Sequence, residues 1–225
     1  MTAQFELDHI FIMTTAKAPE ADSLVELGLK EGAQNSHYGQ GTACRRFFFN
    51  NAVLELLWIE DEAEALLPQT APTKLWERAH PAQTGYSPFG VCLRPSPANT
   101  DPNEPPFPAW IYKPDYLPGE LSIFIAENAD HPEEPMLFYL PFATNTKTAP
   151  HDPQHLNNTA VSTISKIEIA YVAQPTHSAA IETLSSNSEL VFISATEPKM
   201  SITFDNAKAG KNIDLSAILP LELKL

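Results

Sequence analysis

Two stretches of the chain, residues 5–13 and 52–59, have the hydrophobic pattern of strands that are buried on both faces. Each carries an ionisable residue among apolar neighbours, His9 in the first and Glu55 in the second. Successive side chains of a strand point to opposite faces, so both residues share a face with apolar side chains. A buried carboxylate is costly unless it is paired, hydrogen-bonded or bound to a metal. Glu55 and His9 are therefore the first candidates for a functional site.

The segment between these stretches predicts one short helix and further strands. Apolar residues at helical spacing after Pro19 predict an amphipathic helix that ends near Gly28. A glycine-punctuated loop follows over residues 37–42, and then a strand over 44–49. Asn50 and Asn51 predict the turn into the second stretch. The predicted order is strand, helix, strand, strand, strand.

The middle of the chain predicts strands and no helix of its own. A proline-rich polar segment over residues 95–108 is expected to be an internal loop, because strand patterns resume after it. The middle is either a degenerate module or a set of strands added to the same sheet. The last part repeats the opening order, and we expect it to enclose a concave site together with the first module. The predicted organisation is a first module over 1–82, a central strand-rich region over 83–155 and a last module over 156–225.

Three short motifs in the first module form a pattern that resembles a known superfamily. They are Leu7-Asp8-His9-Ile10, the loop His37-x-Gly39-Gln40-Gly41-Thr42 leading into Arg45, and Leu54-Glu55-Leu56. The chain resembles the glyoxalase-like branch of the vicinal-oxygen-chelate superfamily over most of its length. The resemblance implies an α+β fold in which paired βαβββ modules form open, cupped mixed sheets. It also implies that ligands for a divalent metal, such as Mn, Fe, Ni or Zn, come from the first and fourth strands of a module.

This resemblance assigns expected roles to residues of the first module. His9 and Glu55 are the expected metal ligands, and Glu55 and His37 the expected catalytic residues. Strand alternation sends Arg45 and its neighbour Arg46 to opposite faces, and the family pattern favours Arg45 as the one inside the cup. The expected substrate-binding residues are Arg45, Gln40, Thr42 and Trp58.

The sequence does not show a complete set of metal ligands. The matching strands elsewhere offer Glu168, Asp214, Cys92 and Tyr139, none of which is a convincing ligand. His151 and His155 have a ligand-like spacing, but Pro150 and Pro153 disfavour the helix that would bring them to one face. Whether a metal is bound stays open at this point.

Charge and composition narrow the choice of partner. The 225 residues include 28 acidic and 14 basic ones, for a net charge of −14, which disfavours nucleic acid and anionic membranes as main partners. Cys44 and Cys92 are the only cysteines, and both are expected to be buried free thiols. Without a membrane-length apolar run or a signal-peptide pattern, we expect a cytoplasmic protein. Relatives complete sites within one chain or across two, so a homodimer is also an expectation.

Two classes of function follow. The first is a metal-dependent lyase, isomerase or dioxygenase that acts on a small oxygenated metabolite. The second is a metal-free protein of the same fold that binds or sequesters a small molecule. In the second case the apolar lining is expected to come from Trp58, Trp110, Phe47 and Tyr139.

Overall fold

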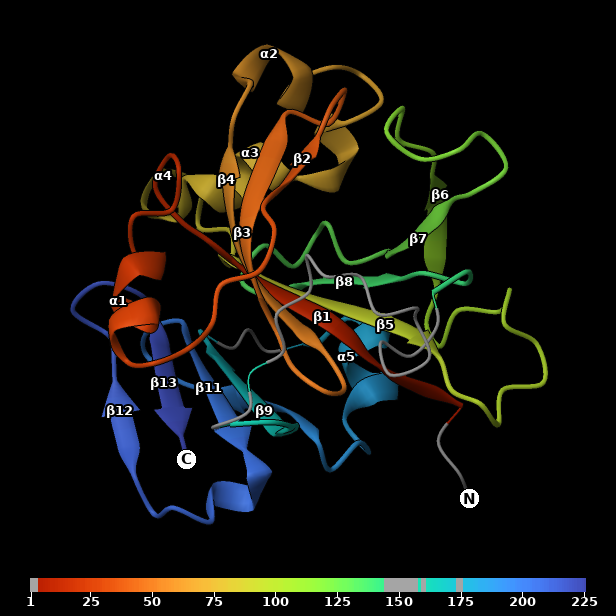
Figure 1. Cartoon of the computed structure of the whole chain (residues 1–225). Helices are drawn as coiled ribbons and strands as arrows, with labels where there is room; N and C mark the ends of the chain where they lie inside the picture. The colour runs from red at the N-terminus through yellow and green to blue at the C-terminus, as the bar shows by residue number, and fades with distance from the viewer. Residues whose placement is uncertain (1–3, 144–157, 159–160, 173–175) are drawn as a thin grey trace.

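Two mixed β-sheets pack face to face in the computed structural model of the chain, which describes residues 4–143, 158, 161–172 and 176–225 (Figure 1). The larger sheet has eight strands in the order β2-β3-β4-β1-β5-β8-β7-β6, and the smaller has five in the order β10-β9-β11-β13-β12. No helix among the described residues is both long and apolar enough to cross a membrane.

The first half of the large sheet has the predicted order of elements. It consists of β1 (Phe5–Met13), α1 (Ala21–Glu26), β2 (Asn35–His37), β3 (Thr42–Phe48) and β4 (Val53–Ile59). β1 pairs with β4 in parallel, and β4 then pairs with β3 in antiparallel. The helix is shorter than predicted: Ala21 and Leu24 are buried, whereas Val25 is 44% exposed.

The central region forms the second half of the same sheet. Four short helices over residues 62–84 connect the first half to this region. The region itself contributes the strands β5 (Phe89–Pro95), β6 (Ala109–Tyr112), β7 (Ile123–Ala126) and β8 (Met136–Tyr139). The helices are α2 (Glu62–Ala65), η1 (Ala71–Thr73), α3 (Leu75–Ala79) and α4 (Pro81–Thr84). β5 pairs with β1 at the centre, so the order outward from β5 mirrors the order outward from β1. The proline-rich segment is an internal loop between β5 and β6, as predicted.

The C-terminal part forms the smaller sheet and does not help to enclose the cup. Its elements are β9 (Ile164–Tyr171), α5 (Ala179–Leu184), β10 (Leu190–Ser194), β11 (Lys199–Phe204), η2 (Asp205–Ala207), β12 (Asn212–Asp214) and β13 (Leu221–Lys224). The order of strands and helix along the chain is as expected, with β13 as an additional strand. Within the sheet, β9 lies between β10 and β11 and pairs with both. The central strands complete the cup that His9 and Glu55 line, and the hollow between the first and last modules is a separate one.

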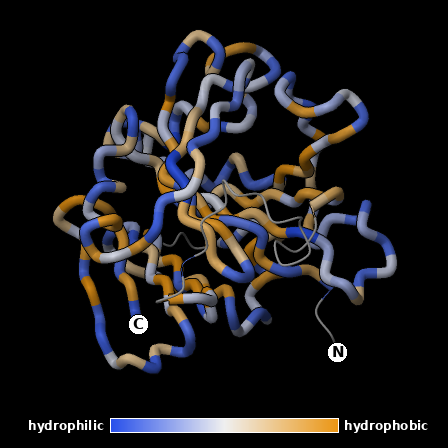
Figure 2. Tube along the Cα trace, in the orientation of Figure 1, coloured by the Kyte–Doolittle hydropathy of each residue, from blue (hydrophilic) through white to orange (hydrophobic). Residues whose placement is uncertain are grey.

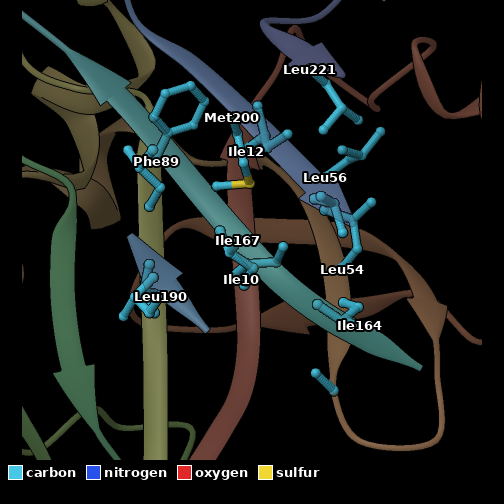
Figure 3. Close-up of a cluster of buried hydrophobic side chains, with 14 of the residues drawn as sticks. Ile10, Ile12, Leu54, Leu56, Phe89, Ile164, Ile167, Leu190, Met200 and Leu221 are labelled. Atoms are coloured by element: carbon cyan, nitrogen blue, oxygen red, sulfur yellow. The ribbon is translucent and has the colours of Figure 1, made fainter. Parts of the chain in front are cut away.

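One hydrophobic core joins the two sheets. Ile10 and Ile12 of β1 and Leu54 and Leu56 of β4 are fully buried, and they belong to one cluster with side chains of the small sheet (Figure 3). Figure 2 shows hydrophobic segments concentrated on the central strands, with hydrophilic stretches in the outer loops. The alternate residues of β1 and β4, which include His9 and Glu55, face the other side of the large sheet.

Shortening a side chain in this core should destabilise the whole fold. Leu56→Ala removes a buried side chain from the contact between the sheets, so we expect unfolding free energy to fall by about 2–5 kcal/mol. Ile111→Ala, at a residue that is 57% exposed on edge strand β6, should cost less than about 1 kcal/mol. Urea denaturation followed by circular dichroism measures both, and equal losses would contradict this account of the core.

Candidate functional site

A cavity of about 890 Å³ opens on the face of the large sheet opposite the small sheet. Both halves of the large sheet line it. The first half contributes most of the ionisable groups, namely Asp8, His9, His37, Arg46 and Glu55. The second half contributes mainly apolar strand residues, namely Ile123, Ile125, Met136, Phe138 and Leu140. The cavity thus has a charged wall and an apolar wall.

His9 is held in place by a buried chain of charged groups. Its Nδ1 lies 2.7 Å from Oδ1 of Asp8, which sits where the pairing of β1 with β5 shifts register. The other carboxylate oxygen of Asp8 accepts a hydrogen bond from Arg94, at 3.2 Å. Arg94 is 1% exposed and also pairs with Glu6 at 3.2 Å. Because Asp8 occupies Nδ1, Nε2 is the ring nitrogen left for a ligand or for the thiol of Cys92.

These contacts raise the pKa of His9 and lower the pKa of Asp8. Burial disfavours the imidazolium, but Cys92, Glu55 and Asp8 outweigh it and raise the pKa of His9 well above its ordinary value. Burial also opposes charge on Asp8, yet the hydrogen bond and charge of His9, together with Arg94, lower the pKa of Asp8. Both shifts favour the charged forms of this hydrogen-bonded pair, a carboxylate on Asp8 and an imidazolium on His9.

Glu55 lines the same cavity from β4. Among the described residues no cation comes within ion-pair distance of its carboxylate. Its charge is felt by several neighbours, and it helps to raise the pKa of His9 and of the buried Cys44 thiol. A partly buried carboxylate without a cationic partner among the described residues thus lines the cavity.

The two neighbouring arginines lie on opposite faces of β3, and the one inside the cup is Arg46. Arg45 points to the side of α1, where it binds Glu31 in a bidentate ion pair and Asp22 at 2.8 Å. Arg46 lines the cavity. The expectation that Arg45 faces the cup is therefore wrong. Strand alternation correctly predicted that the two arginines lie on opposite faces of β3. Which of these faces turns toward the cavity depends on where α1 packs.

The loop over 37–42 places His37 and Gln40 at the cavity wall. Asn35 Nδ2 donates to Nε2 of His37 at 3.0 Å, so Nδ1 carries the proton and bonds Oγ1 of Thr42 at 3.0 Å. Burial lowers the pKa of His37, with His9 and Arg46 adding to the effect. Both ring nitrogens are thus occupied within the protein, an arrangement that favours a loop-positioning role over the expected proton transfer.

The same loop ties the two halves of the cup together. Gln40 donates to Oγ1 of Thr42 at 2.8 Å and accepts a bond from the hydroxyl of Tyr116 at 3.4 Å. Tyr116 lies between β6 and β7, in the second half, and the centroid of its ring is 4.9 Å from that of His37.

A side chain at Gly41 would place its Cβ 2.1 Å from the carbonyl oxygen of Asp61, so only glycine fits at this position of the loop.

Several expected site residues lie elsewhere. Thr42 is buried beneath the loop and does not line the cavity. Trp58, Phe47 and Tyr139 belong to the core between the sheets, so the expected lining by these residues is wrong, and Trp110 packs against the apolar cluster under the cup without lining the cavity. Trp58, Phe47 and Tyr139 each lie next in sequence to a residue that faces the cup.

Of the other candidate ligands within the described residues, Cys92 alone lies next to His9 and Asp8. Glu168 and Asp214 lie in the small sheet and pair with lysines. Cys44 and Cys92 are buried free thiols, as predicted. His151 and His155 lie outside the described residues.

Sequence reasoning missed two residues that shape the site, Arg94 and Tyr116. A signal for Arg94 was present, since an arginine directly after the apolar run 89–93 is as anomalous as Glu55. Tyr116 lies in a loop with no periodic pattern, and only its long-range contact with Gln40 reveals it.

The donor groups of the residues that the structure describes do not complete a resident metal site. The one group of three His, Cys or acidic side chains close enough to share an ion among the described residues is Asp8, His9 and Cys92. Asp8 is already bound to His9 and Arg94, and Cys92 does not line the cavity. A metal in the cup would therefore meet His9 and Glu55, fewer than the three or four protein ligands such sites normally have. Strand β8 turns only apolar side chains to the cavity.

A cupped sheet of two mirrored halves around one cavity defines a protein of the vicinal-oxygen-chelate type. Comparison with protein-family models agrees, since the model of the glyoxalase-like domain matches residues 7–185. The chain belongs to this glyoxalase-like family. No curated protein matches its sequence.

Two solved structures illustrate the likeness of fold. A hypothetical protein from Staphylococcus aureus is 11% identical with a TM-score of 0.57, over 97% of this chain and 98% of its own. This similarity supports the fold alone. Hypothetical protein BH1468 from Bacillus halodurans C-125 is 14% identical with a TM-score of 0.38, over 61% of this chain and 94% of its own. The second similarity is too low to support a structural inference.

Removing the cation that neutralises Asp8 should strongly destabilise the protein. Arg94→Met leaves the Asp8 carboxylate buried with His9 as its remaining charged partner, so we expect a loss of about 3 kcal/mol in unfolding free energy. Lys199→Met removes the cation of a surface pair with Asp214 and should cost less than about 1 kcal/mol. Denaturant melts compare the two, and a small loss for Arg94→Met would show that the chain of charges adds little.

Proposed function

We propose that the protein binds a small oxygenated molecule in the cup and contacts it with its own side chains rather than through a resident metal. The observation that supports this most is that His9 and Glu55 line one wall of a cavity whose other wall consists of apolar strand residues. Ligand sites are typically concave and mostly apolar, with a few placed polar groups. This cavity is concave and has an apolar wall, but about half of the residues that line it are polar or charged.

His9 and Glu55 have complementary abilities toward an oxygenated ligand. The raised pKa of His9 favours its protonated form, in which both ring nitrogens are hydrogen-bond donors. A Glu55 carboxylate accepts hydrogen bonds and protons. A donor and an acceptor at one cavity suit binding of a carbonyl or hydroxyl group, and would also suit proton transfer on it.

The metal-dependent lyase, isomerase or dioxygenase is the second candidate. It is favoured by Asp8, which orients Nδ1 of His9 in the way that carboxylates orient metal-bound histidines. His9 and Glu55 would then hold the ion, which would supply Lewis-acid chemistry to adjacent ligand oxygens.

Metal content separates the two candidates. For protein purified without a metal-affinity tag, we expect elemental analysis to find well under one equivalent of Mn, Fe, Ni or Zn, unchanged in His9→Ala and Glu55→Gln. Glu168→Gln is the matched control, because Glu168 pairs with Lys166 and Lys224 outside the cup. Near-stoichiometric metal that disappears in both cup variants but stays in the control would establish the second candidate instead.

Binding in the cup is testable with a neutral probe, 1-octanol, by saturation-transfer NMR. We expect a signal with the wild type and a much weaker one with Ile125→Gln, which places a polar group on the apolar wall. Ile111→Gln is the control, because Ile111 is exposed on the adjacent strand β6. Equal signals from both variants, with unchanged thermal melts, would contradict binding in this cavity.

A further inference from the structure

Arg46 has no acidic partner among the described residues, unlike Arg45 and Arg94. Arg45 and Arg94 each pair with two carboxylates. Arg46 donates to the backbone carbonyl of Ala33 at 2.7 Å and makes a longer contact to that of Gln34 at 3.5 Å. Within the part of the chain that the structure describes, no carboxylate comes within ion-pair distance of it. Arg46 lines the cavity, and its guanidinium also lies over the ring of Phe48, 5.1 Å from the centroid. The N–H donors that these contacts do not use remain for a ligand.

The acidic groups of the cup leave this charge uncompensated at short range. Glu55 is the cross-strand partner of Arg46 in the pairing of β3 with β4, yet the two side chains do not form an ion pair. Asp8 is bound to Arg94 and His9, and Asp115 lies against Gly39 at the rim. A ligand anion would thus meet free donors of Arg46 without displacing an existing ion pair.

The opposite wall dictates the rest of the ligand. Ile125, Met136 and Phe138 of the second half line the cavity as a continuous apolar surface, joined by Phe11 and Leu57 from the first half. A small inorganic anion would leave this surface without a partner. The planar fork of arginine matches both carboxylate and phosphate oxygens, but the single charge of Arg46 balances a carboxylate and not a dianionic phosphate.

We infer that the cup takes a carboxylate carried on an apolar body, with the carboxylate bound by Arg46 and the body packed against the strands of the second half. This inference rests on the proposed binding function and specifies the chemical class of the ligand. It makes Arg46 a specificity-determining residue that selects acids over neutral or basic molecules of the same shape.

The test uses three probes of equal chain length, namely octanoate, 1-octanol and octylamine, with affinities measured by NMR titration in buffer containing EDTA. The wild type should bind octanoate most tightly. Arg46→Met should weaken octanoate binding by about tenfold or more and leave octanol binding nearly unchanged, because it removes a charge-assisted hydrogen bond and keeps the apolar stem. Arg45→Met removes the same charge one residue away, on the other face of β3, and should retain the preference for octanoate.

Each other outcome has a distinct meaning. If octanoate and octanol bind equally well to the wild type, or if both arginine variants lose octanoate binding alike, the inference about Arg46 is wrong while binding in the cup stands. If none of the three probes binds, the inference and the proposed function both fail for this ligand size. Thermal melts of both variants exclude loss of folding as the cause, and Arg46→Lys tests whether charge alone suffices or the planar fork is required.

Discussion

The structure depends on the alternation of side chains along β4 and along β1 from His9 onward, after the register shift at Asp8. On one face, Ile10, Ile12, Leu54 and Leu56 are fully buried against the small sheet and fix the position of the large sheet. The residues between them must then face the other side, where there is no second layer of sheet. Burial on one face thus forces the ionisable side chains of the same strands into the cup. The charged wall is a consequence of the core.

Charge inside the cup is stabilised in two different ways. Asp8 and His9 are hydrogen-bonded to each other, and Arg94 donates to the other carboxylate oxygen of Asp8 and balances its charge. A buried group of this kind is expensive to break because each remaining charge would lose its partner. Glu55 and Arg46 instead face the cavity without an ion pair between them. The first set is already satisfied within the protein, so the second set is where a ligand has most to gain.

The two halves of the cup have diverged in chemistry while keeping mirrored strand order. The half around β1 and β4 provides most of the ionisable side chains, and the half around β5 and β8 provides an apolar surface. Such a division suits an amphipathic ligand that spans both halves. It also accounts for the small number of donor groups that the described residues offer to a metal, since a cup with ligands on both halves would need polar residues on β8.

The sequence by itself determined the order of strands in the first half, the burial of both cysteines and the presence of His9 and Glu55 on strand faces that apolar residues otherwise occupy. Alternation shows which residues share a face, but not which face turns inward. That depends on where α1 and the small sheet pack, through contacts distant in sequence. Only the tertiary structure could therefore place Arg46 rather than Arg45 in the cup, move Trp58 into the core and reveal Arg94 behind Asp8. For the same reason it alone showed that the central strands, and not the C-terminal ones, complete the site.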